Sequence, residues 1–387
     1  MGVASANEFR VTPGFIDAHS HLRSTSYHEH GIRGESLEEA LLRMTAMTGV
    51  DIADDVFVAC SELIAKGVTG VQMMFHTFGD PDDYRETLDH TVQGITRSGI
   101  RALVVLGITD SAEFVPPGLD PAGLIPDFSA PSRRLTPDEF GDVVEHALAN
   151  YPHVSFGVGP VGPQWCTDSL LNTIGDISQH NLRIHSHFAE SEAQRHWSGD
   201  LLARMKQSAL LGPQTSLAHA VWLEDSEIEE LRDLGVTLVT CPLSNHLLRA
   251  GAADVASWQQ RGISFSVGLD SADRDATPIA VATRAVSRDD AVLALTVGGQ
   301  SASGLDTTAD RVEWSSDTLE TPFSVSINGQ HVVVDGQLTA GEDVNRARER
   351  ISERMLADEA SRKARHQILD GHMPKYLKAI AQVMHER

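Results

Sequence analysis

The sequence has few cysteines, and their spacing excludes two common kinds of structural site. There are three in 387 residues, Cys60, Cys166 and Cys241, and no two of them form a Cys-x-x-Cys pair. Neither a disulfide framework nor a structural zinc motif is therefore indicated. The Pro-Cys-x-x-Cys signature of the small zinc deaminases is also missing, because Cys241 is followed by Pro-Leu-Ser.

Long apolar runs and basic residues are scarce as well. No segment approaches the roughly 18 consecutive apolar residues of a membrane span, and the N-terminal MGVASANEFR lacks the apolar core of a signal peptide. Lys and Arg number 31 against 54 Asp and Glu, which gives a formal net charge of −23. Such a chain is a poor partner for nucleic acid or for an anionic membrane. We therefore expect a cytoplasmic protein that binds neither.

What the sequence does contain is a regular alternation of short apolar runs and amphipathic stretches. Eight runs have the length of buried strands: Phe15–Ala18, Val68–Phe75, Ala102–Ile108, Val154–Val158, Leu182–His187, Ser216–His219, Val236–Cys241 and Ile263–Leu269. The helical patterns between them include Leu37–Thr48, Asp54–Lys66, Tyr84–Ser98, Pro137–Asn150, Leu201–Leu211 and Ser226–Leu234. Eight strand–helix repeats predict an α/β fold, the (β/α)8 TIM-type barrel. A doubly wound open sheet is the alternative, although no Gly-x-Gly-x-x-Gly follows the first strand.

The chain changes character after about residue 300. The segment Phe323–Gly336 alternates apolar and polar residues around Asn328-Gly329, which is typical of a β-hairpin. The residues from 342 to the end are charged and helical in pattern, with a break expected at Pro374. We expect a small β appendage followed by a helical tail.

Potential ligands for a metal ion gather at the ends of the predicted strands. His19 and His21 end the first strand, and residues two apart in a strand point to the same side. The other candidates at strand ends are His185, His187, Glu190, His219 and Asp270. The carboxyl ends of barrel strands meet on one face, which is where barrel active sites form. Imidazoles and carboxylates together suit zinc or iron.

Five stretches, taken in order, resemble one protein family. They are PGFIDAHSHL, HSHFAESE, SLAHAVWL, TCPLSNHLL and SVGLDSAD. Together they resemble the amidohydrolase superfamily, and within it the aminohydrolase and chlorohydrolase branch that acts on purines, pyrimidines and triazines. The resemblance implies a barrel with one divalent metal ion, zinc in the first place and iron as the alternative. It implies His19, His21, His187 and Asp270 as the metal ligands, Glu190 as the acid that protonates the substrate ring, and His219 as the residue that positions or deprotonates the water.

The chemistry expected of such a site is hydrolytic deamination. A divalent ion can bring the pKa of bound water from about 15.7 towards 7, and the resulting hydroxide attacks an amidine-like ring carbon. Glu190 would deliver a proton to the ring, and His219 and Asp270 would pass protons to the leaving ammonia. The alternatives are opening of a cyclic amide, displacement of chloride, and a non-catalytic barrel that serves as a binding scaffold.

Two further features bear on the metal site. His185 shares its strand face with His187 but lies deeper, so we expect it to fill a barrel layer or to support a ligand from behind. Related enzymes with two ions use a carboxylated lysine on the fourth strand. Ser155–Pro160 has none, which favours a single ion.

The candidate substrate-binding residues follow strands two, four and seven. They are His76, Gln164, Trp165 and Asn245. Gln164 could bind a ring amide edge and Trp165 could stack on a heteroaromatic face, although Trp165 fits a loop core equally well. Relatives acting on adenosine-type thioethers carry Pro-His-Ser-Pro after strand four, where this chain has Val161 in place of the histidine. The expected partner is a small heterocyclic substrate, and a homo-oligomer is left open.

The resemblance also suggests how the chain is divided. Relatives carry some fifty residues before the His-x-His strand, and about twelve precede it here, so the small β domain should be reduced; an upstream start site is the alternative. We expect an N-terminal remnant of that domain at 1–12, the metal-dependent hydrolase barrel at 13–318, the β appendage at 319–341 and the helical tail at 342–387.

Overall fold

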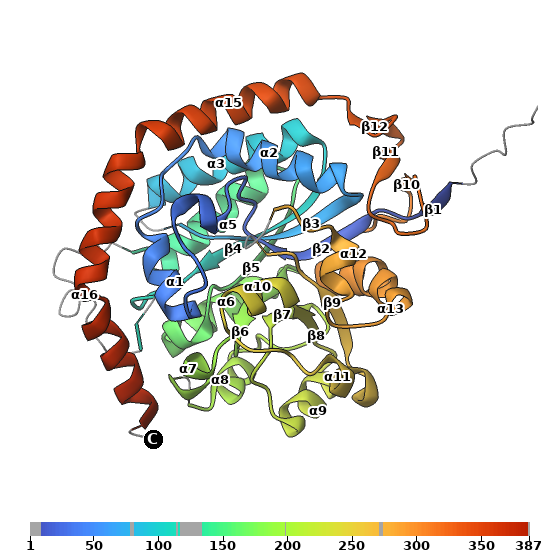
Figure 1. The fold of residues 1–387 in the computed structure, drawn as a ribbon. Coiled ribbons are helices and arrows are strands. Elements are labelled where there is room, and N and C mark those ends of the chain that lie inside the picture. Colours follow the sequence, from blue (N-terminus) through green and yellow to red (C-terminus); the bar gives the residue numbers. More distant parts are fainter. Residues whose placement is uncertain are drawn as a thin grey trace, which may run out of the picture.

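The computed structural model is built around a barrel of eight parallel strands (Figure 1). It describes residues 9–77, 81–113, 115–116, 134–197, 199–270 and 274–385. The barrel strands are β2 (Phe15–Ser20), β3 (Val68–Phe75), β4 (Arg101–Ile108), β5 (Ser155–Pro160), β6 (Arg183–Phe188), β7 (Thr215–His219), β8 (Thr237–Thr240) and β9 (Ser264–Val267). Each pairs in parallel with the next in chain order, so the predicted (β/α)8 barrel is confirmed.

The strands form where the sequence is continuously apolar because the barrel covers both of their faces. All eight residues of β3 are buried, as expected of a parallel strand with side chains inside the barrel and helices outside it. Gly67 leads into β3 with φ 82°, and a Cβ there would lie 2.3 Å from the Trp314 ring. The turn therefore requires glycine for its backbone angle and for its close packing.

Helices surround the barrel (Figure 1). Those of the repeats are α1 (Leu37–Met44), α2 (Ile52–Ala65), α3 (Pro81–Ser98), α5 (Pro137–Asn150), α6 (Asp168–Ser178), α7 (Glu192–Trp197), α8 (Leu201–Gln207), α9 (Asp225–Asp233), α10 (Pro242–Leu247), α11 (Val255–Arg261), α12 (Pro278–Ala282), α13 (Arg288–Leu293) and α14 (Gly299–Ser303). Short 3-10 turns span η1 (Tyr27–His30) and η2 (Pro163–Trp165), and a π-helical turn, η3 (Ala294–Gly298), joins α13 to α14.

The barrel closes between β2 and β9 through a buried carboxyl group. Asp17 Oδ1 accepts from the backbone N–H groups of Leu269, at 2.8 Å, and His19, at 3.2 Å. Next to it, the Asp270 N–H donates to the His19 carbonyl at 2.8 Å. The closure therefore joins β2, which carries His19, to the end of β9, which Asp270 follows.

A second, antiparallel sheet lies against the amino end of the barrel. Its order is β1 (Arg10–Thr12), β10 (Arg311–Trp314), β11 (Pro322–Ile327), β12 (Gln330–Val334) and β13 (Gln337–Leu338). The expected hairpin is β11–β12, and its turn residues Asn328 and Gly329 have φ 53° and 77°, as a two-residue hairpin turn requires. The sheet also includes β10, which lies before residue 319.

The C-terminal tail is helical as expected, but its interruption lies elsewhere. α15 (Gly341–Ala357) ends at Asp358, and α16 (Glu359–His385) runs through Pro374 without a break. Asp358 fixes the junction, because it accepts from Thr48 at 2.8 Å and from Arg365 at 2.6 Å. The break predicted at Pro374 is therefore wrong. Buried side chains on both sides of the proline hold the helix against the barrel, and this packing offsets a local cost of about 3 kcal/mol.

α16 supports α1 from outside. Leu369, Met373, Tyr376 and Ile380 of α16 form one buried apolar cluster with Leu42, Ala46, Trp165 and Trp197. The Tyr376 hydroxyl also donates to the Glu38 carbonyl of α1 at 3.1 Å. Figure 1 shows α15 and α16 wrapping round one side of the barrel.

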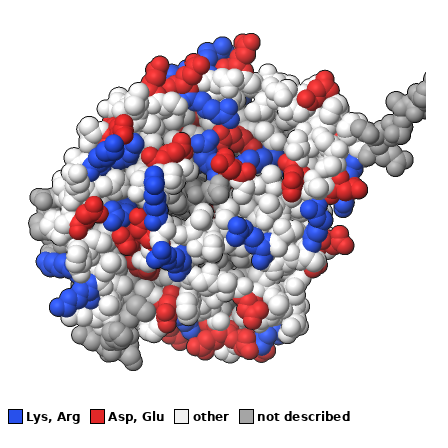
Figure 2. Space-filling model, in the orientation of Figure 1, with Lys and Arg blue, Asp and Glu red and all other residues white. Residues whose placement is uncertain are grey.

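The surface is mixed in charge. In Figure 2 basic and acidic side chains are intermingled over the visible face, and acidic ones gather at its lower edge over α9. Within the described ranges, no helix has the length and apolar character needed to cross a membrane.

Candidate metal centre and active site

The polar residues predicted at the strand ends meet at the carboxyl face of the barrel. His19 comes from β2 and His21 follows it, His187 comes from β6 and His219 ends β7. Asp270 follows β9. One ligand nitrogen each of His19, His21 and His187 lies within 4.8 Å of the others. The groups predicted from the strand ends therefore lie close together in the structure.

Backbone carbonyls orient two of the three imidazoles. His21 Nδ1 lies 3.2 Å from the Met74 carbonyl and His187 Nδ1 lies 2.7 Å from the Val161 carbonyl. Because a carbonyl only accepts, both Nδ1 atoms carry the proton and both Nε2 atoms present lone pairs. These Nε2 atoms are 3.3 Å apart. Two nitrogens bound to one tetrahedral zinc at about 2.0–2.1 Å would be separated by roughly 3.3–3.4 Å.

His19 is oriented by another histidine. His185 Nδ1 lies 2.8 Å from Ser216 Oγ and 3.1 Å from the Ser216 carbonyl, so its Nε2 can accept from His19 Nδ1 at 2.8 Å. His19 Nε2 is buried and has no hydrogen-bond partner in the part of the chain that the structure describes. The donor set therefore consists of three imidazole nitrogens held in place through their opposite ring nitrogens, which is how proteins fix metal-binding histidines.

The carboxylate of Asp270 lies beside this set. Its Oδ1 lies 3.7 Å from His21 Nε2. Burial alone raises the pKa of this carboxyl, but the nearby His21 and His219 outweigh it and hold the pKa below the ordinary value. Burial also lowers the pKa of His19 and His187, and it lowers that of His21 to about 4. Neutral imidazoles and an ionised carboxylate are the forms that bind a divalent cation, so the residues fit one.

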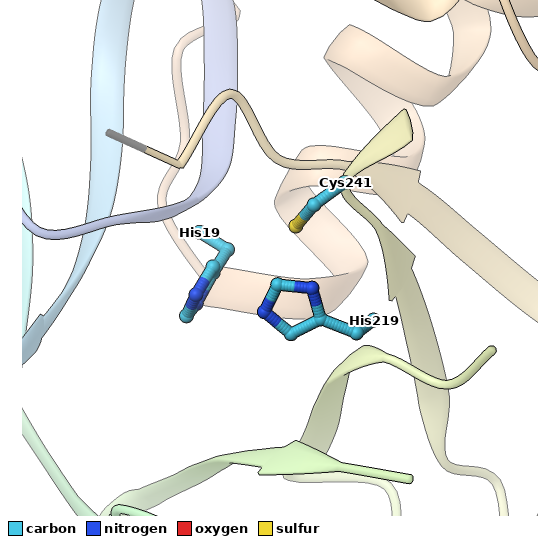
Figure 3. Close-up of side chains that lie close together, drawn as sticks. All are labelled: His19, His219 and Cys241. Carbon is cyan, nitrogen blue, oxygen red and sulfur yellow. The ribbon is translucent and has the colours of Figure 1, made fainter. Parts of the chain in front are cut away.

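Figure 3 shows a second group at the same place. His19, His219 and Cys241 point toward one another, with ligand atoms within 4.8 Å. Sequence reasoning did not select Cys241, although it directly follows β8 at a strand end like the others. Burial raises the pKa of its thiol well above the usual range. A thiol must lose its proton to bind a metal, whereas the Asp270 carboxyl is already ionised.

Glu190 and His219 stand together beside the donor set. His219 Nδ1 donates to Asn245 Oδ1 at 2.8 Å and lies 3.4 Å from Glu190 Oε1. Burial raises the pKa of Glu190 to about 8. The carboxyl therefore carries a proton at neutral pH, as a general acid must. Left-handed backbone at Ala189, His219 and Asp270, with φ of 46°, 67° and 58°, turns the chain sharply at these strand ends.

A cavity of about 150 Å³ opens next to these groups. A volume of this size holds one benzene-like ring. Apolar side chains from α1 form one wall, Leu37, Leu41 and Met44, together with Leu248. The other lining residues are His21, Arg23, Tyr27, Thr45, His76, Glu113, Val161, Trp165, His187, Glu190, Gln194, His219 and Asp270.

The structure separates the four candidate substrate-binding residues. His76 and Trp165 line the cavity, and Trp165 is also part of the core, with its Nε1 donating to the Val115 carbonyl at 3.1 Å. Gln164 and Asn245 lie outside the described lining. Gln164 is buried in η2, and Asn245 orients His219 from behind.

Sequence reasoning missed Glu113 and the α1 wall. Glu113 follows β4, so the rule used at the other strand ends could have found it. The α1 wall carried no comparable signal, because Leu37–Met44 shows only the apolar pattern of any amphipathic helix.

His185 offers a first test of the metal centre. Replacing it with leucine removes the acceptor for His19 Nδ1 and should weaken ion binding about 10- to 100-fold. His185→Gln, whose amide oxygen can accept the same bond, should retain more affinity. Competition with a chromophoric chelator measures the change, and His180→Leu at an exposed position is the matched control. Equal affinity in all four proteins would show that His185 does not position the ligand.

Comparisons with known proteins identify relatives of this chain. The family model described as "Amidohydrolase family" matches residues 10–314. The chain is 27% identical over 274 residues to a 5'-deoxyadenosine deaminase of Methanothermobacter thermautotrophicus, which covers 68% of this chain and 58% of that protein. It is 36% identical over 127 residues to a probable guanine deaminase of Schizosaccharomyces pombe, covering 31% of this chain and 24% of that protein. The chain thus spans less than two thirds of these relatives' length.

Solved structures share the fold. Atrazine chlorohydrolase TrzN from Arthrobacter aurescens TC1, complexed with zinc, superposes with a TM-score of 0.71 at 18% identity, covering 90% of this chain and 88% of that one. E. coli guanine deaminase gives a TM-score of 0.67 at 16% identity, covering 84% and 85%. At these identities the likeness concerns the fold alone.

Proposed function

Because the chain belongs to the amidohydrolase family, we propose that it is a metal-dependent hydrolase that deaminates a small nitrogen heterocycle and releases ammonia. One observation carries the proposal: two imidazole lone pairs face each other at 3.3 Å, in His21 and His187, beside the ionised Asp270. Facing lone pairs repel unless a cation lies between them. The buried acid Glu190 stands next to this position.

We infer that the donor set holds one divalent ion. Three nitrogen ligands and one oxygen suit zinc, with iron as the alternative. The ligands would be His19, His21, His187 and Asp270. An ion held there would activate water as a nucleophile at neutral pH. β5 contributes no lysine that could bridge a second ion.

The chain's own residues supply the proton transfers. Glu190 is protonated at neutral pH and can give its proton to a ring nitrogen, which makes the neighbouring carbon electrophilic. His219 donates to Asn245 through Nδ1, so its Nε2 is the basic atom. Burial lowers the pKa of His219, which keeps that nitrogen available to accept a proton from the attacking water.

The cavity favours a small ring over a nucleoside. Its volume of about 150 Å³ suits one ring, and Leu37, Leu41 and Met44 form an apolar wall against which a ring can pack. Relatives include a 5'-deoxyadenosine deaminase and a probable guanine deaminase. Of these two substrate types, the lining fits a free base better than a nucleoside.

The reaction can be tested with a substrate panel. We expect ammonia release from at least one class among guanine, 8-oxo-purines, cytosines, pterins and aminotriazines. The zinc-loaded Glu190→Gln protein, prepared in the same way, corrects for contaminating deaminases. Measuring chloride from chlorotriazines and ring opening of lactams in parallel separates the alternatives. If those compounds are turned over and no member of the panel releases ammonia, the deaminase proposal is wrong.

A further inference from the structure

A buried carboxyl group outside the set described above faces the same cavity. Glu113 lies in the loop after β4 and is 4% exposed, yet it lines the cavity together with Glu190 and His187. Its Oε1 accepts from the Thr109 hydroxyl at 2.5 Å. None of the proton transfers assigned above uses this residue.

Two further polar side chains lie near the Glu113 carboxyl. His76 Nε2 is 4.0 Å from Oε2, and Arg134 Nη1 is 4.0 Å from Oε1, both beyond hydrogen-bond distance. Among the described residues, Thr109 therefore provides the one hydrogen bond recorded for the Glu113 carboxyl.

A carboxyl in this position needs a donor. Ionised carboxylates accept about four hydrogen bonds, and a buried one that lacks partners is costly. Burial raises the pKa of Glu113 to about 7, so a donor supplied by a ligand would favour the ionised form. Apolar side chains of α1 line another wall of the cavity. A hydrogen bond from a ring in these apolar surroundings to Glu113 would therefore be strong.

We propose that Glu113 is a specificity-determining residue that binds an N–H group of the substrate other than the amine that is removed. The substrate is then a heterocycle with a second N–H donor, such as a diamino ring or an amino ring with an adjacent ring N–H. The identity of the leaving group rests on the proposed function, whereas the binding interaction itself does not. A site that pairs with a substrate N–H discriminates strongly against the analogue that lacks it, because one oxygen of the buried carboxyl then lacks a donor.

Binding can be measured separately from turnover. Calorimetry on zinc-loaded Glu190→Gln protein compares diamino-s-triazine with monoamino-s-triazine. We expect the diamino ring to bind roughly 10- to 100-fold more tightly. Adding Glu113→Gln should remove most of this preference by weakening the diamino ring, with little change for the monoamino ring.

The matched control distinguishes recognition from loop anchoring. Thr109→Val keeps the Glu113 carboxyl but removes its hydroxyl partner. We expect it to change both affinities in parallel and to leave their ratio within about threefold of the parent protein. Zinc content and thermal unfolding are measured for each protein to confirm folding.

The outcomes separate this inference from the proposed function. A preference for the diamino ring that disappears in Glu113→Gln supports the role of Glu113, whether or not the wild type releases ammonia. Equal binding of the two rings, or a preference that persists in Glu113→Gln, overturns it even if the wild type deaminates both. Absence of ammonia from the whole substrate panel bears on the proposed function alone.

Discussion

Replacing Glu190 with glutamine should lower kcat about 10²- to 10⁴-fold, the usual contribution of a general acid. Glutamine keeps the shape of the side chain but cannot give a proton to the substrate ring. The bound metal should remain, because Glu190 is not one of the proposed ligands, His19, His21, His187 and Asp270. Steady-state ammonia release and zinc content, measured on the same preparation, test both parts of the expectation.

Glu38→Gln is the matched control. Glu38 is also buried, and it bonds to Ser191, the residue after Glu190, so the substitution makes the same chemical change close by. Its carboxyl does not line the cavity as described, and kcat should stay within a few-fold of the wild type. If Glu190→Gln turned over normally, the acid role would be wrong. If it lost zinc, the loss of rate would have a structural cause.

The second large effect concerns the ion. His187→Ala removes one of the three proposed imidazole ligands, and we expect the protein to lose its ion and its activity together. The wild type should contain one zinc or iron ion per chain by elemental analysis. Removal of the ion by a chelator should abolish turnover. It should also lower the free energy of unfolding by about 3–4 kcal/mol, compared with protein in a solution whose free ion concentration is 100–1,000 times the dissociation constant. Adding the ion back should restore both in the wild type and neither in His187→Ala.

An exposed histidine provides the comparison. His153→Ala changes the same residue type on the surface and should leave ion content and unfolding temperature unchanged. Two ions per chain, or full activity in protein that demonstrably contains none, would contradict the single-ion centre.

The sequence was most informative where the fold imposes a simple periodicity. Parallel strands covered on both faces must be apolar throughout, so the eight runs stood out and all eight form barrel strands. Because side chains alternate along a strand, His19 and His21 had to share a side, and strand ends had to share a face of the barrel. The positions of His187, His219 and Asp270 followed from the same reasoning.

Contacts between elements distant in sequence could not be predicted in this way. Pro374 ends a helix by local preference, but packing of α16 on the barrel overrides it. Asn245 was placed at the substrate from its position after a strand, whereas its side chain bonds to His219. The wall formed by α1 depends on how a loop helix folds over the barrel, and no local pattern encodes that placement.

The arrangement of α1 and α16 has a consequence for how this enzyme could change. The apolar wall comes from a helix that carries no proposed ion ligand, and a helix more than 300 residues later in the chain supports it. The apolar wall and the groups proposed for hydrolysis thus come from different elements of the fold. A library of variants confined to Leu37, Leu41 and Met44 would explore new ring sizes and substituents while leaving the hydrolytic groups intact. A wall on its own element can thus change by mutation without replacing the groups proposed for hydrolysis.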